Sequence, residues 1–133
     1  MKGMNTDVSV GRLQLASVSD RIIGCAFTVA NTPGVGFMKK VYENALAHEL
    51  RKTGLSVEQQ YGIPIIYDGL IVGDYVADLL VGRRILVELK AVKALDAVHA
   101  AQCLNYLRAT GMPVCLLLNF GRSRLEIRRL VWV

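Results

Sequence analysis

The 133-residue sequence has little of what a disulfide-bonded, zinc-binding or membrane-spanning protein needs. It has three cysteines without CxxC spacing and two histidines, His48 and His99. An odd number of separated cysteines is typical of reduced, buried thiols, and so few soft ligands argue against a structural zinc site. The longest run without charge, residues 22–38, is interrupted by Asn31, Pro33 and two glycines, and no signal-peptide order flanks it. The composition therefore predicts a cytoplasmic protein without a membrane span.

Size and charge further limit the class of protein to which this sequence can belong. The hydrophobic fraction is 53% and the charged fraction 20%, so we expect a folded chain. The length fits one domain over residues 1–133, in which residues 1–18 form a loose N-terminal segment. Lysine and arginine number 16 against 11 acids, a net charge of +5, and a basic domain suits a polyanion such as nucleic acid. The basic excess near the C-terminus fits a solvated strand edge equally well.

Hydrophobic periodicity and turn residues predict alternating helices and strands. Ser19 or Asp20 caps a first helix that ends near Asn31, and Asp96 caps a later helix that reaches Thr110. A helix is also expected over 37–52, and strands over 56–61, 63–67, 70–81, 85–91, 114–119 and 125–133. The uncharged run 114–119 is typical of a strand buried on both faces. This order predicts an α/β domain with a mixed sheet.

Three charged residues stand inside the apolar strands. Asp78 is the only charge in residues 76–80, and Glu88 is the only one in 85–89, with Lys90 two residues later. Because side chains alternate faces along a strand, Glu88 and Lys90 share a face. A three-residue turn at 82–84 places Asp78 opposite Glu88, whereas a two-residue turn points Asp78 away. We predict the three-residue turn, since Gly82 supplies the positive φ that it needs.

Two carboxylates on one face are hard ligands for Mg²⁺ or Mn²⁺, and the backbone carbonyl of Leu89 adds a third. Such a metal activates water and neutralises the charge of a phosphodiester, while Lys90 orients the nucleophile or stabilises the transition state. The residues alone leave open a simpler interpretation, a buried cluster of ion pairs among Asp78, Glu88 and Lys90.

The spacing of these residues resembles a known motif. Asp78, nine intervening residues and then Glu88-Leu89-Lys90 resemble the PD-(D/E)XK motif of metal-dependent nucleases. The segments that resemble the GxxExxY family, a small branch of that superfamily related to RecB-like nucleases, are 34–37, 41–46, 57–60, 73–78, 87–92 and 104–107. The resemblance covers roughly residues 20–121. It implies a PD-(D/E)XK nuclease-like core, a central mixed β-sheet flanked by helices, with a metal-dependent site.

Gln102 and Tyr106 lie four residues apart on one helical face. A Gln-x-x-x-Tyr pair after the ExK strand is similar to the extra motif of RecB-like nucleases, which implies that both residues position substrate or ligands. Ordinary helix packing is the alternative for this pair. Basic side chains that are candidates for phosphate contacts are Lys39, Lys40, Arg83, Arg84 and Lys93.

One position departs from the family signature G-x-x-E-x-x-Y. Here the stretch from Gly36 to Tyr42 has Lys39 where the family has glutamate. This lysine reverses a charge near the metal site, where its ammonium competes with a cation for the carboxylates. Glu43, one turn later on the same face, is an alternative acid, or it simply pairs with Lys39 at i,i+4.

Three functions follow. The first is an Mg²⁺-dependent nuclease that acts on DNA. The second is a catalytically impaired nuclease-fold module that binds nucleic acid or a protein partner, because of Lys39. The third is an enzyme that acts on a small phosphorylated substrate. A homodimer through the apolar residues 130–133 stays an alternative to packing of Trp132 on its own core.

Overall fold

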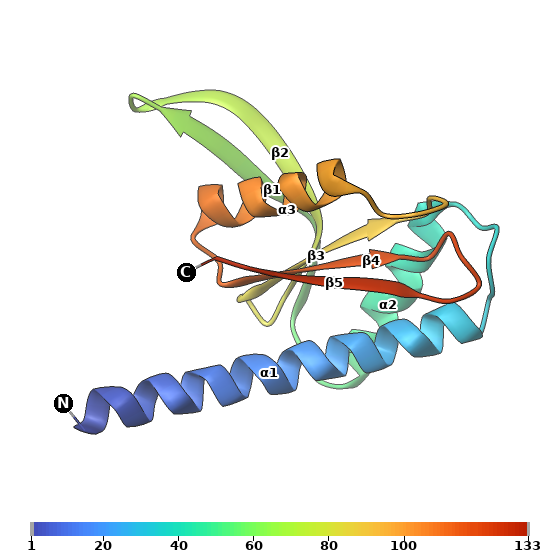
Figure 1. Cartoon of the computed structure of the whole chain (residues 1–133), viewed down its shortest axis with the longest axis horizontal. Helices are drawn as coiled ribbons and strands as arrows, with labels where there is room; N and C mark the ends of the chain where they lie inside the picture. Colours follow the sequence, from blue (N-terminus) through green and yellow to red (C-terminus); the bar gives the residue numbers. More distant parts are fainter. Residues whose placement is uncertain (1, 133) are drawn as a thin grey trace.

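The computed structural model describes residues 2–132, with side chains from residue 14 onward. Within these residues, two helices are followed by three strands, a third helix and two more strands (Figure 1). They are α1 (Lys2–Asn31), α2 (Lys39–Lys52), β1 (Val57–Tyr67), β2 (Leu70–Val81), β3 (Ile85–Lys90), α3 (Ala97–Thr110), β4 (Val114–Asn119) and β5 (Glu126–Val131). The strands form one sheet in the order β1-β2-β3-β4-β5, in which β3 and β4 are parallel and the other neighbours antiparallel. The predicted α/β class with a mixed sheet is confirmed.

Helices cover both faces of the central strands. On one face, Leu89 and Leu116 belong to a core cluster with residues of α1 and α2. On the other face, Leu86 and Leu117 pack with residues of α3. All six residues of β4 are buried, as the uncharged sequence predicted. This packing fixes β3 between two helical layers, and β3 carries Glu88 and Lys90.

The β2–β3 hairpin has the predicted three-residue turn. Val81 pairs with Ile85, and Leu79 pairs with Val87. The backbone pairing ends at Leu79 and Val87, and beyond it Asp78 and Glu88 are joined by hydrogen bonds from the backbone of one strand to a carboxylate of the other.

Two predicted boundaries are wrong. Segments 56–61 and 63–67 form the single strand β1, because Gly62 pairs with Val76 within the ladder and does not interrupt it. Helix α1 begins at Lys2, so Ser19 and Asp20 lie inside the helix and cap nothing. Leu15 and Val18, which precede Ser19, already pack against the core cluster, and this tertiary packing outweighs the weak capping preference. Helix α3 begins and ends as predicted, with Asp96 as N-cap and Gly111 as left-handed C-cap.

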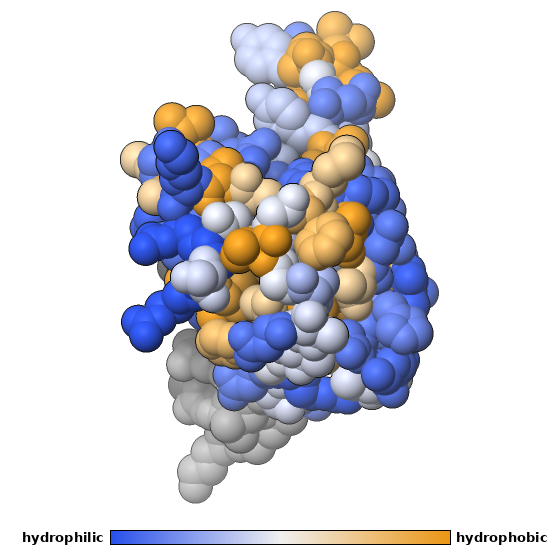
Figure 2. Space-filling view, turned by 90° about the vertical axis from the view of Figure 1, so that its right-hand side faces the viewer, coloured by the Kyte–Doolittle hydropathy of each residue, from blue (hydrophilic) through white to orange (hydrophobic). Residues whose placement is uncertain are grey.

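The β1–β2 hairpin extends beyond the sheet (Figure 1). Its end is apolar and exposed, as the orange atoms at the top of Figure 2 show. The exposed apolar residues at this end are Ile66, Tyr67, Leu70, Ile71 and Val72. Within residues 2–132, no helix has the length and apolar character that crossing a membrane requires.

Candidate functional site

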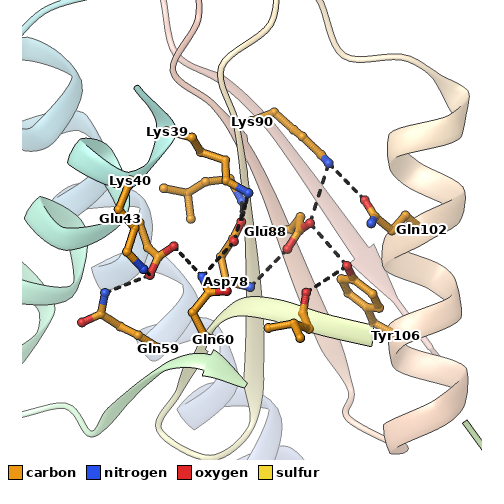
Figure 3. A network of polar contacts seen from close by, with 12 residues as sticks. Lys39, Lys40, Glu43, Gln59, Gln60, Asp78, Glu88, Lys90, Gln102 and Tyr106 are labelled. Carbon is orange, nitrogen blue, oxygen red and sulfur yellow. Dashed lines mark hydrogen bonds and ion pairs between the residues drawn. The ribbon is translucent and has the colours of Figure 1, made fainter. Parts of the chain in front are cut away.

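Asp78 and Glu88 lie side by side where the β2–β3 ladder ends (Figure 3). They are only 4% and 3% exposed, respectively. The backbone N–H of Asp78 donates to Glu88 Oε1 at 3.2 Å, and the N–H of Leu89 donates to Asp78 Oδ2 at 2.8 Å. Each carboxylate therefore accepts a hydrogen bond from the backbone of the opposite strand, which fixes both side chains across the gap between the strands.

The electrostatics of this pair favour a bound cation. Burial and, after it, the neighbouring charge of Asp78 raise the pKa of Glu88 to about 7. Two charged carboxylates in one buried place repel each other unless a cation lies between them or beside them. The donor set consists of hard oxygens, which is the chemistry that Mg²⁺ and Mn²⁺ prefer.

The backbone of Leu89 supplies a third oxygen. In a strand, the N–H and C=O of one residue point toward the same neighbouring strand. The Leu89 N–H donates to Asp78, so its carbonyl also faces that side. No three His, Cys, Asp or Glu side chains of the part that the structure describes gather into a metal-binding group. The residues thus fit a cation held by two carboxylates and one carbonyl, with water completing the shell as Mg²⁺ usually requires.

Helix α3 adds two side chains to this pair. Gln102 Oε1 accepts a hydrogen bond from Lys90 Nζ at 3.1 Å, and this ammonium lies 3.7 Å from Glu88 Oε2. The Tyr106 hydroxyl lies 3.2 Å from the carbonyl oxygen of Val76 and 3.4 Å from Glu88 Oε2. Burial raises the pKa of Tyr106, so the hydroxyl keeps its proton and serves as a donor. The structure therefore brings Lys90, Gln102 and Tyr106 to the carboxylate pair.

Lys39 approaches the same carboxylates from the start of α2 (Figure 3). Its Nζ lies 3.1 Å from Asp78 Oδ1 and 3.3 Å from Oδ2. The alternative pair with Glu43 does not form, because Glu43 Oε2 accepts from Lys40 Nζ at 2.9 Å. Lys39 thus holds a cationic group against one of the candidate metal ligands.

Glu43 is fully buried and belongs to a second layer of the site. Its Oε1 accepts from Gln60 Nε2 at 2.7 Å, and its Oε2 accepts from Gln59 Nε2 at 2.8 Å. Gln60 Nε2 also lies 3.4 Å from Asp78 Oδ1. Gln60 has a φ of +55°, which is uncommon for a residue other than glycine. Glu43 therefore contacts the candidate metal ligands only through Gln60.

The two glutamines were not predicted as site residues, although they lie in segment 57–60, which carries the family resemblance. Asn119 was also missed, because a single amide at the end of an apolar strand gives no signal. Its Oδ1 accepts from Val92 N at 3.0 Å and from Gly121 N at 3.0 Å, and its Nδ2 donates to Val92 O at 2.9 Å. Asn119 thus fixes the loop that leads from Lys90 to α3.

The remaining basic candidates lie outside this cluster. Lys93 is exposed on the loop after β3. Arg83 and Arg84 are exposed on the β2–β3 turn, at the opposite end of β3 from Lys90. Arg84 is four residues from Glu88, or roughly 13 Å along an extended strand. The structure therefore brings Lys39 to the carboxylates and does not bring the turn arginines there.

Comparison with known proteins bears on the whole site. A search of curated proteins and a search of solved structures each gave no match. A family model described as the PD-(D/E)XK nuclease superfamily matches residues 16–130, which include every site residue above. The acid on β2, the acid and lysine on β3, and the mixed sheet that holds them all lie within this match. The chain belongs to the PD-(D/E)XK nuclease superfamily.

Proposed function

We propose that this chain is a metal-dependent nuclease that hydrolyses phosphodiester bonds in DNA. The observation that carries the proposal is the buried pair of Asp78 and Glu88, each braced by the backbone of the other strand, with the Lys90 ammonium 3.7 Å from Glu88. Two buried acids in contact repel each other unless positive charge neutralises them. A site for Mg²⁺ or Mn²⁺ formed by both carboxylates and the Leu89 carbonyl accounts for their burial side by side.

The contacts of each residue indicate its role in the proposed reaction. A bound divalent cation lowers the pKa of water and offsets charge on a phosphate. Lys90 presents its ammonium beside Glu88, where it orients the attacking water or stabilises charge that develops on the phosphate. Gln102 positions Lys90 through its amide oxygen. Tyr106 positions Glu88, since its protonated hydroxyl lies beside Oε2.

The finer assignments belong to the same proposal. The motif segments around Tyr42 and Glu88 support membership of the GxxExxY branch, close to RecB-like nucleases. The net charge of +5 supports a nucleic acid as substrate, with Lys39, Lys40, Arg83, Arg84 and Lys93 as candidate phosphate contacts. A cytoplasmic location and a homodimer stay predictions from the sequence.

A cleavage assay tests the proposal. The full chain is incubated with supercoiled, linear and single-stranded DNA in Mg²⁺ or Mn²⁺, with EDTA as the metal-free condition. We expect metal-dependent cutting that Glu88→Gln abolishes, because the amide keeps the shape of the side chain and removes its charge. Asp74→Asn is the matched control, since Asp74 is an exposed acid on the same strand as Asp78. Cutting that survives in Glu88→Gln contradicts the proposed site.

The ion pair between Lys39 and Asp78 favours a second candidate function. An ammonium that occupies both oxygens of Asp78 leaves fewer sites for a metal. The chain would then bind nucleic acid or a protein partner without cutting. Folded protein that binds DNA with salt-sensitive affinity and cuts none of the substrates in either metal supports this second function.

A further inference from the structure

Two hollows lie beside α3, on the side of the β1–β2 hairpin, and are together called the groove. They adjoin each other, with volumes of about 370 and 450 Å³, and share Tyr75 and Asn105. The first hollow begins at Lys90 in the candidate active site, and the second continues to Arg108 and Ala109. From residue 98 to residue 109 the helix rises about 17 Å.

The groove is basic, partly apolar and supplied with amides. Among the described residues that line the two hollows, none is acidic, and the permanent positive charges come from Lys90 and Arg108. Gln102 and Asn105 project amide groups from α3. The Arg108 guanidinium lies 5.3 Å from the ring centroid of Trp132, which orients it. Basic groups beside an apolar floor complement a chain whose phosphates are charged and whose bases are flat.

Tyr75 connects the groove to the candidate active site. Its side chain is 48% exposed on β2, and its ring centroid lies 6.1 Å from that of Tyr106. The Tyr106 hydroxyl in turn lies 3.4 Å from Glu88 Oε2. The Tyr106 ring therefore links Tyr75 to the carboxylate pair, and Lys90 lines the same hollow as Tyr75. The nuclease assignment gives this exposed aromatic no other role.

We infer that the groove binds single-stranded nucleic acid, with one base stacked on Tyr75, a base edge at the Asn105 amide and a phosphate at Arg108. This inference rests on the proposed function and names its substrate class. Stacking on Tyr75 requires a base with one free face, which a single strand, a frayed end or a flap offers and a paired duplex does not. The strand then passes Lys90 and brings a phosphodiester to Asp78 and Glu88.

Binding without metal tests the inference separately from catalysis. Fluorescence anisotropy in EDTA compares the full chain with a labelled single-stranded oligonucleotide and with a duplex of equal length. We expect preference for the single strand, and Tyr75→Ala to weaken that binding roughly 5- to 100-fold, the usual effect of losing one base–aromatic stack. Tyr75→Phe keeps the ring and restores binding. Arg108→Gln lowers the salt slope of binding by about one unit.

Tyr67→Ala is the matched control, because Tyr67 lies on the same hairpin, is 72% exposed and does not line either hollow. If the groove binds the single strand, the Tyr67→Ala variant binds the oligonucleotide with the same affinity as the wild type. Tyr75→Ala with wild-type affinity overturns the inference, and so does preference for the duplex. Because these measurements exclude metal, a failure to cut DNA contradicts the proposed nuclease and leaves the groove assignment standing.

Discussion

We predict that replacing Lys39 by methionine tightens the binding of a divalent metal at the proposed site. The wild-type ammonium lies 3.1 and 3.3 Å from the two oxygens of Asp78, where a cation would bind. A metal must displace this ammonium before it reaches Asp78. Methionine keeps the length and the apolar stem of the side chain and removes the charge, so the variant loses this competition and little else.

The exposure of Lys39 and Asp78 sets the free energy that their ion pair contributes. The Lys39 side chain is 43% exposed and that of Asp78 is 6% exposed, so their pair is intermediate between a surface and a buried ion pair. Surface pairs contribute about 0.2–1 kcal/mol, whereas breaking a buried pair costs about 3–5 kcal/mol. We take about 1–2 kcal/mol for this pair. Removing it therefore tightens metal binding roughly 5- to 30-fold, since about 1.4 kcal/mol is tenfold in affinity.

The same change destabilises the metal-free protein. Lys39→Met leaves the buried carboxylate of Asp78 without its ammonium, so we expect the free energy of unfolding in EDTA to fall by about 1–2 kcal/mol. Added Mg²⁺ or Mn²⁺ restores it, and the metal-induced rise in melting temperature is larger in the variant than in the wild type.

Isothermal titration with Mn²⁺ and thermal unfolding with and without metal measure both effects. Lys52→Met is the matched control, because it removes one positive charge from the other end of the same helix, where Lys52 pairs with Glu49 at 2.8 Å. Equal metal affinity in the two variants refutes the argument that Lys39 competes for Asp78. An unchanged stability of metal-free Lys39→Met refutes the value assigned to the ion pair.

Three further changes test the surroundings of the site. Gly121→Ala makes a methyl group collide with the backbone of Val92, so we expect urea unfolding to show a loss of about 1–3 kcal/mol, and unchanged stability contradicts the close contact. Tyr106→Phe removes the hydroxyl beside Glu88 and lowers the cleavage rate about 10- to 100-fold at unchanged circular dichroism; a wild-type rate assigns Tyr106 to packing alone. A hydrogen bond with the Cys103 thiol and burial raise the pKa of Cys115, so we expect a thiol reagent at neutral pH to label Cys115 only after denaturation. Rapid labelling of Cys115 in the folded protein argues against its burial.

The sequence predicts the centre of this site because buried charge is rare in strands. Asp78 and Glu88 interrupt apolar runs, and an odd-length turn at Gly82 predicts that they lie opposite each other. The alternation of faces along a strand then predicts Lys90 on the same side as Glu88. These are local rules of short range; the structure confirms the three-residue turn and brings the three side chains together.

These local rules do not predict the contacts between elements that are far apart in the sequence. For Lys39 the sequence left two partners open, the site carboxylates and Glu43 at i,i+4, and only the structure shows that the lysine reaches Asp78 on another element. The positive φ of Gln60 and the hydrogen bonds of Asn119 also depend on segments far away in the sequence. The start of α1 was misplaced for a related reason, since packing against the sheet outweighed the capping preference of Ser19.

The network around Asp78 separates the charge of the site from its geometry. When Lys39 leaves, Asp78 Oδ2 still accepts the Leu89 N–H at 2.8 Å, and Oδ1 still lies 3.4 Å from the Gln60 amide. Gln60 is held by Glu43, which is itself buried and has both oxygens occupied. Glu43 is therefore a support for the candidate metal ligands and not a free replacement for the missing acid. Lys39 changes the charge that a cation meets, while the shape of the site depends on Glu43, Gln60 and the strand backbone.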